Sequence, residues 1–249
     1  MLIDTHCHLL DPVFDADRAA VVARARAAGV AHAVVMAENE AENHRVLAAA
    51  RLDGFVLPAA GHYPACLDLE MAARTEAFIR EHRAELAAVG EVGVDHRITE
   101  DPADHAVQDA ILRRLAAVAA ELDLPLSVHS RAAGRHAIEV LRSTAAARVV
   151  MHAFDGRYGA AVSGLDAGYY FSVPPSIVRS RQKQKLVKQL PLDRLLLESD
   201  APVLGPDPAA RNEPANLRVA AEAIAGLKRR SLDEVLGAIV ENTRRVFSR

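Results

Sequence analysis

Short apolar runs alternate along the chain with longer stretches, rich in Ala, Leu and Val, whose apolar residues recur at helical spacing. The short runs predict strands over residues 2–5, 33–36, 56–59, 87–89, 126–128, 149–151, 169–172 and 195–198. The longer stretches predict helices over 16–28, 40–52, 68–84, 104–122, 134–146, 157–167, 178–189 and 214–227, then a helical pair over 231–240 and 242–248. The chain therefore predicts regular alternation of strand and helix.

Eight strand–helix units follow one another with no linker-like stretch between them. Such alternation is typical of a parallel sheet with helical crossovers. Eight units in 249 residues match a (β/α)8 TIM barrel, which usually has about 250 residues. We therefore predict an α/β fold in which residues 1–249 form a single barrel domain, with its catalytic site at the carboxyl ends of the strands. A doubly wound open sheet is the alternative.

The first predicted strand leads into Asp4-Thr5-His6-Cys7-His8. Residues i and i+2 of an extended chain share a face, so Asp4, His6 and His8 point one way and Cys7 the other. Two imidazoles at one strand end can converge on a divalent metal, although two histidines satisfied by backbone groups would give the same pattern. We expect Cys7 to pack in the core.

The ends of other strands carry the same kinds of side chain. The residues at these ends are His62, Glu91, His129, His152 and Asp200. Histidine, glutamate and aspartate are ligands for Zn, Mn or Mg, and in a barrel the strand ends meet at the catalytic face. Buried without metal or partners, such groups would be costly. The pattern predicts a metal site.

Six ligands that include two carboxylates suit two divalent ions of unknown identity. The division we expect gives one ion His6, His8 and Asp200, the other His129 and His152, with Glu91 bridging both. A carboxylated lysine cannot form the bridge, because the first lysine in the chain is Lys183.

Composition restricts the partners and the compartment. The net charge of −3 excludes a globally basic surface, so nucleic-acid binding would need a local basic patch or a metal site. Two cysteines are too few for a disulfide framework. No signal peptide is evident, and no apolar run approaches the roughly 18–20 residues that cross a bilayer. We expect a cytoplasmic protein with no membrane partner, and the sequence suggests no obligate protein partner.

At the level of motifs the chain resembles the TatD-like metal-dependent deoxyribonucleases of the amidohydrolase superfamily. The matching segments are Ile3-Asp4-Thr5-His6-Cys7-His8-Leu9, Gly90-Glu91-Val92-Gly93-Val94-Asp95, Val128-His129-Ser130-Arg131, Met151-His152-Ala153-Phe154-Asp155-Gly156, Leu197-Glu198-Ser199-Asp200-Ala201-Pro202, Arg211-Asn212-Glu213-Pro214 and Asn242-Thr243-Arg244-Arg245-Val246-Phe247. The resemblance implies a (β/α)8 barrel, a dinuclear divalent-metal site and phosphodiester hydrolysis, often 3′→5′ removal of nucleotides from DNA. The family's metal ligands fall on His6, His8, Glu91, His129, His152 and Asp200.

Several polar residues are candidates for catalysis or for substrate binding. We expect Asp200 to accept the proton of the attacking water and Glu91 to serve catalysis as the bridging ligand. His62 and Arg131 are candidate contacts for a phosphate, with a loop ion pair as the alternative for Arg131. Asp95 is either an acceptor for a ligand imidazole or a loop ion-pair acid.

A basic run follows the seventh strand, and it either binds nucleic acid or forms a solvated helix face. Its members are Arg179, Arg181, Lys183, Lys185 and Lys188. Three functions stay open: a deoxyribonuclease or other phosphodiesterase, a hydrolase of C–N or C–O bonds in a small molecule, and a non-enzymatic metal-binding scaffold.

Overall fold

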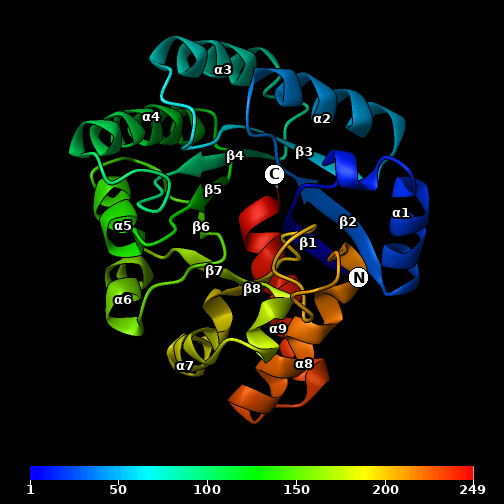
Figure 1. Ribbon diagram of the computed structural model, residues 1–249. Coiled ribbons are helices and arrows are strands. Elements are labelled where there is room, and N and C mark those ends of the chain that lie inside the picture. The colour runs from blue at the N-terminus through cyan, green and yellow to red at the C-terminus, as the bar shows by residue number, and fades with distance from the viewer. Residues whose placement is uncertain (249) are drawn as a thin grey trace.

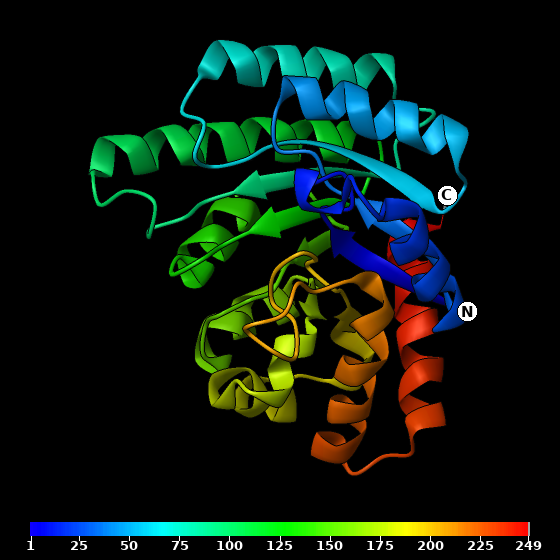
Figure 2. The ribbon, with the colours of Figure 1, turned by 45° about the vertical axis from the view of Figure 1, so that its right-hand side comes forward.

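The computed structural model describes residues 1–248, in which eight parallel strands form a nearly closed barrel with the helices outside it (Figures 1 and 2). The strands are β1 (Leu2–Cys7), β2 (Val30–Val35), β3 (Val56–His62), β4 (Ala88–Gly93), β5 (Leu126–His129), β6 (Val149–Met151), β7 (Tyr170–Val173) and β8 (Leu195–Leu197). The helices are α1 (Arg18–Ala27), α2 (Glu40–Leu52), α3 (Leu69–Glu81), α4 (Pro102–Glu121), α5 (Gly134–Arg142), α6 (Tyr158–Asp166), α7 (Arg181–Gln189), α8 (Leu217–Lys228) and α9 (Leu232–Phe247). Each strand pairs in parallel with the next along the chain, which confirms the predicted barrel.

The predicted helical pair at the end of the chain is wrong, because α9 is one continuous helix. Ser231 and Glu234 start it with a reciprocal capping box. Asn242, next to the expected break, is buried and donates its side-chain amide to the carbonyls of Leu192 and Leu195, 2.9 Å away in each case. Its side chain therefore does not compete with the helix backbone.

The predicted starts of α7 and α8 lie three residues too early, and the predicted ends of α3 and α5 lie three and four residues too late. Residues 175–178 and 214–216 form 3-10 turns that begin with proline, so α7 and α8 start three residues after the predicted positions. Helix α5 ends at Arg142, where the hydroxyls of Ser143 and Thr144 bond back to helix carbonyls.

The barrel closes between β1 and the segment that follows β8. The backbone nitrogen of Asp200 donates to the carbonyl of His6 at 2.9 Å, and that of His8 donates to the carbonyl of Ala201 at 2.8 Å. The two segments therefore meet at the residues that bear candidate ligands.

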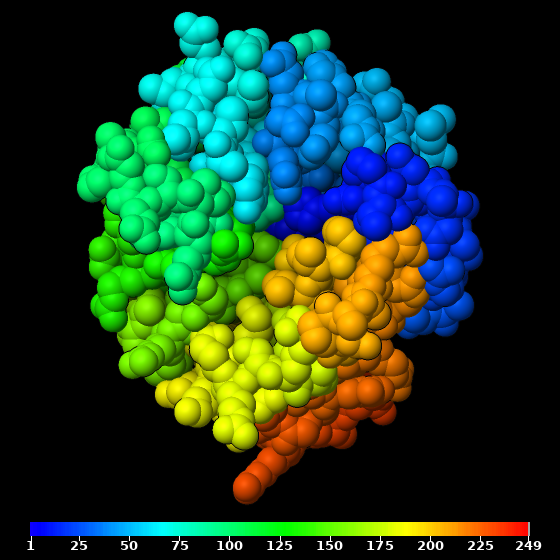
Figure 3. Space-filling view, in the orientation of Figure 1, coloured from blue at the N-terminus to red at the C-terminus, as the bar shows by residue number. Residues whose placement is uncertain are grey.

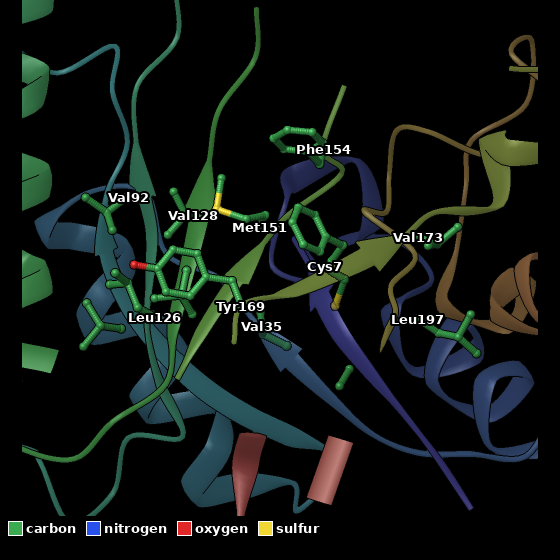
Figure 4. Close-up of a cluster of buried hydrophobic side chains, with 14 of the residues drawn as sticks. Cys7, Val35, Val92, Leu126, Val128, Met151, Phe154, Tyr169, Val173 and Leu197 are labelled. Carbon is green, nitrogen blue, oxygen red and sulfur yellow. The ribbon is translucent and has the colours of Figure 1, made fainter. Parts of the chain in front are cut away.

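Most buried apolar side chains lie in one large cluster shared by strands and helices. Cys7 belongs to this cluster, together with Leu126, Met151 and Phe154 (Figure 4). The predicted packing role of Cys7 is confirmed. Smaller clusters formed mainly by strand residues pack against Phe247, so the end of α9 also contributes to the core.

Candidate metal centre

The six predicted ligands meet at the carboxyl ends of their strands. His6 lies in β1, Glu91 in β4 and His129 at the end of β5, whereas His8, His152 and Asp200 lie just beyond β1, β6 and β8. All are buried except His8, whose side chain is 16% exposed. The space-filling view shows a hollow on this face, bordered by the N-terminal segment in blue and the loop after β8 in gold (Figure 3).

The two carboxylate oxygens of Glu91 face different imidazole pairs. Its Oε2 lies 3.5 Å from Nε2 of His6 and 3.3 Å from Nε2 of His8. Its Oε1 lies 2.7 Å from Nδ1 of His129 and 3.8 Å from Nε2 of His152. Glu91 is therefore the central acceptor of the cluster.

Glu91 reaches the centre of the cluster because the backbones of the neighbouring strands pack closely around it. A Cβ atom at Gly61 would overlap the amide nitrogen of Glu91, and one at Gly93 would overlap the carbonyl oxygen of His129. Glycine at these two positions lets β3, β4 and β5 approach one another beneath the ligands.

Asp200 faces Glu91 across the cluster. Its Oδ1 lies 3.7 Å from the Nε2 atoms of His6, His8 and His152. The backbone of Asp200 has a φ of 54°, in the left-handed region that a non-glycine residue adopts at a cost of about 1–3 kcal/mol. Asp200 thus contacts imidazoles from both halves of the expected division, because the rings of His6 and His152 stack with centroids 3.5 Å apart.

Each imidazole has a polar partner on its other ring nitrogen. The pairs are His6 Nδ1 with Ser127 Oγ at 3.0 Å, His8 Nδ1 with Glu38 Oε1 at 3.5 Å, His129 Nε2 with Asp95 Oδ2 at 2.8 Å, and His152 Nδ1 with Glu198 Oε2 at 2.7 Å. Partners of this kind fix the tautomer and orientation of a metal-ligating histidine and raise its basicity.

The structure decides between the two roles expected for Asp95. Its carboxylate is fully buried, lies 2.8 Å from His129 and also lies 3.6 Å from Nε of Arg131. Asp95 is therefore an acceptor for the candidate ligand His129, and the ion pair with Arg131 is the longer contact.

The sequence prediction missed the roles of Glu38, Ser127 and Glu198. Glu198 also accepts hydrogen bonds from the Ser172 hydroxyl at 2.5 Å and the Ala153 amide at 2.9 Å. Its position at a strand end, two residues before Asp200, was the available signal.

The carboxylates control the ionisation of the imidazoles beside them. Burial by itself lowers the pKa of His129, but its contacts with Asp95 and Glu91 outweigh burial and raise that pKa to about 10. The same competition between burial and Glu91 raises the pKa of His8 to about 9. Two imidazoles of the centre therefore retain protons at neutral pH.

The pKa values of the more deeply buried His6, Asp200 and Glu91 are also shifted from their usual values. Burial and the neighbouring His152 lower the pKa of His6 to about 4, and burial raises the pKa of the Asp200 carboxyl to about 6. Burial alone would raise the pKa of Glu91, but His6 and His129 hold it well below its usual value.

This donor set fits divalent cations. Within residues 1–248, three groups of residues have ligand atoms within 4.8 Å of one another: His6, Glu91 and His152; His6, His8 and Asp200; and His8, Glu38 and Glu91. Imidazole nitrogens with carboxylate oxygens are typical ligands of Zn and Mn. A cation would supply the positive charge that protons on His8 and His129 otherwise provide.

The sequence matches the model of the TatD-related DNases from residue 3 to residue 248. The chain belongs to this family. The resemblance expected from its motifs is therefore confirmed.

Relatives of known name are similar over nearly their whole length. The chain is 41% identical over 261 residues to human deoxyribonuclease TATDN3, with 99% of this chain and 94% of the human protein covered. It is 32% identical to YabD of Bacillus subtilis, an uncharacterized metal-dependent hydrolase, with 99% of both chains covered. The crystal structure of the TatD homologue YjjV from Escherichia coli superposes with a TM-score of 0.91 at 30% identity, covering 100% of this chain and 98% of YjjV.

The two predicted substrate contacts, Arg131 and His62, differ in solvent exposure. The Arg131 side chain is 57% exposed, and its guanidinium can still contact a ligand. His62 is fully buried, and its ring nitrogen Nε2 lies 2.8 Å from the carbonyl oxygen of Cys66. Its Nδ1 has no hydrogen-bond partner in the part of the chain that the structure describes.

The basic run does not share one face. Arg181, Lys185 and Lys188 are exposed on α7, whereas the ammonium group of Lys183 turns inward and donates to the carbonyl of Ala153 at 2.7 Å. Arg179 precedes the helix and donates to the carbonyl of Gly205 at 3.1 Å. The expectation that Lys183 acts together with its exposed neighbours is therefore wrong.

Among residues 1–248, no helix is both long and apolar enough to cross a membrane.

Proposed function

We propose that this protein is a phosphodiesterase that uses two divalent metal ions to cleave DNA, releasing nucleotides in the 3′→5′ direction. Membership of the TatD-related DNase family makes the chain a metal-dependent hydrolase. The proposal adds the number of ions, the ligands of each ion and the mode of cleavage. The human relative is named a deoxyribonuclease, which supports DNA as the substrate.

The position of Glu91 carries the proposal of two ions. One carboxylate oxygen faces His6 and His8, and the other faces His129 and His152. In the proposal one ion is held by His6, His8 and Asp200, and the other by His129 and His152, with Glu91 shared. Ions of this kind, when bound, lower the pKa of a bound water and stabilise charge on the phosphoryl oxygens.

Asp200 is the proton acceptor in this proposal. Its carboxylate is buried among three imidazole nitrogens, and burial raises its pKa above the usual value. A carboxylate positioned in this way can accept the proton of an attacking water. Asp95 and Glu198 orient the imidazoles of His129 and His152 for metal binding.

Arg131 is the proposed contact for a phosphate. Its side chain is largely exposed and lies 3.6 Å from the carboxylate of Asp95, the partner of His129, and an arginine can bind two phosphate oxygens at once. His62 is the weaker candidate, because the Cys66 carbonyl occupies one of its nitrogens.

The test is a cleavage assay with defined metal content. The protein is stripped with a chelator, reloaded with Mg²⁺, Mn²⁺ or Zn²⁺, and given single-stranded DNA labelled at its 5′ end. We expect a ladder that shortens from the 3′ end and two ions per chain by elemental analysis.

The same protein is given a panel of amides and lactones. Turnover of that panel with no cleavage of DNA or of bis(4-nitrophenyl) phosphate would overturn the phosphodiesterase and favour the C–N or C–O hydrolase. Metal binding with no turnover of any substrate would favour the scaffold.

A further inference from the structure

A groove lies between α6 and α7, on the outside of the barrel. Arg157 and Tyr158 line it from the start of α6, and Arg181, Gln182, Lys185 and Gln189 line it from α7. Its volume of about 490 Å³ falls within the range of roughly 300–1,000 Å³ for ligand-binding pockets. Arg157 directly precedes α6 and Arg181 begins α7, and in this fold these helix starts face the same end of the barrel as the metal centre.

The positive charge of this groove is not neutralised. Arg157, Arg181 and Lys185 are exposed, and within residues 1–248 none of them forms an ion pair. Helix α7 itself carries no acidic residue. Elsewhere on the surface arginines are commonly paired, as Arg80 and Arg114 are with Glu76.

Hydrogen bonds join the α7 side of the groove to the loop that follows the candidate ligand His152. From α7, the Gln182 side chain donates to the carbonyl of Gly156 at 2.6 Å, and the Lys183 ammonium donates to that of Ala153 at 2.7 Å. Both acceptors lie in the loop from His152 to Arg157. Those two residues are five positions apart, so their Cα atoms are at most about 18 Å apart.

We infer that this groove binds the sugar–phosphate backbone of a single DNA strand, next to the part of the strand held at the metal centre; the inference rests on the proposed function. Three unpaired cations match the negative charge of successive phosphates. Tyr158 is half-buried in the groove wall and offers an aromatic ring on which an unpaired base can stack. A neutral small molecule would not need three cations in one groove.

The experiment compares wild type with the triple variant R157Q/R181Q/K185Q. A control, R142Q/R229Q/R244Q, removes the same charge from exposed positions near the C-terminal ends of α5, α8 and α9. Each Mn²⁺-loaded protein is titrated with a fluorescent single-stranded oligonucleotide of about 20 residues whose phosphorothioate linkages resist cleavage. Hydrolysis of bis(4-nitrophenyl) phosphate reports on the metal centre alone, because a small diester does not span the groove.

For the triple variant we expect Kd for the oligonucleotide to rise at least tenfold. The log–log dependence of binding on salt should flatten by about 2, since each single-strand phosphate that a cation neutralises contributes about 0.7 to the slope. The control variant should bind as wild type does, and all three proteins should hydrolyse the small diester at equal rates.

Other outcomes would overturn the inference. Unchanged oligonucleotide binding by the triple variant, or equal weakening in the control, would show that the groove is not the binding surface while leaving the proposed function intact. A parallel loss of small-diester hydrolysis would mean that the substitutions act through the metal centre. Failure of wild-type protein to cleave either DNA or the small diester would instead reject the proposed function.

Discussion

The Asp4 carboxylate accepts two hydrogen bonds from Ser199, one from the backbone nitrogen at 2.8 Å and one from the hydroxyl at 2.5 Å. The two residues are 195 positions apart, and both are fully buried. Burial raises the pKa of Asp4 to about 7, although the bonds from Ser199 act in the opposite direction. This pair therefore ties the first strand to the segment after the last strand, close in sequence to His6 and Asp200.

Replacing Ser199 with Ala should lower stability by about 1–3 kcal/mol, because one oxygen of a buried carboxylate loses its donor. In a chain of this size each 1 kcal/mol lowers Tm by roughly 2–4 °C. The control is S143A, which removes a hydroxyl bonded at an exposed helix end. Equal Tm values for the two variants, measured by calorimetry, would show that the hydrogen bond between Ser199 and Asp4 does not stabilise the barrel more than the exposed bond of Ser143 does.

Replacing Glu91 with Gln should remove activity and one or both ions while leaving the fold intact. An amide offers one oxygen where the carboxylate offers two, and the two oxygens face opposite imidazole pairs. Elemental analysis and circular dichroism check the result. Full occupancy by two ions in this variant would contradict the bridging role.

Replacing Asp200 with Asn should lower kcat at least about 100-fold and change KM far less. A proton acceptor contributes in the transition state, and the amide cannot take up the proton. Steady-state kinetics on the small diester separate the two constants. A kcat within a few-fold of wild type would make Asp200 a ligand without a part in proton transfer.

Replacing Asp95 with Asn should weaken metal affinity about 10–100-fold, because the carboxylate behind His129 raises the basicity of that imidazole. The chain offers a matched control in D109N, since Asp109 holds His136 at 2.7 Å in the same kind of pair away from the ligands. Titration with Mn²⁺ should give a weaker affinity for the Asp95 variant than for the Asp109 variant. Similar affinities would show that Asp95 does not support metal binding through His129.

Metal affinity should rise with pH across the neutral range. The pKa values of His8 and His129 are raised to about 9 and about 10, so both imidazoles carry protons at pH 7 that a bound cation must displace. Calorimetric titration in buffers of different ionisation enthalpy should show proton release on binding, and the release should decline as pH approaches 10. Binding with no proton exchange at pH 7 would contradict this account.

The sequence by itself determined the barrel, and it grouped the candidate ligands at one end of that barrel. Strand–helix alternation has only a few compact solutions, and the carboxyl ends of parallel strands must meet at one face, so His6, Glu91, His129 and Asp200 could be grouped without coordinates. The spacing of His6 and His8 on an extended strand placed both on one side.

Only the tertiary structure decided which partner each side chain took. Asp4 shares the expected face with His6 and His8, yet its carboxylate turns to Ser199. The Lys183 side chain points away from its exposed basic neighbours and donates to the Ala153 carbonyl. The partners in these two hydrogen bonds are 30 and 195 positions apart in the sequence, and they meet only after the strands have packed. Hydrophobic periodicity, by contrast, indicates only which face of a strand or helix a residue occupies.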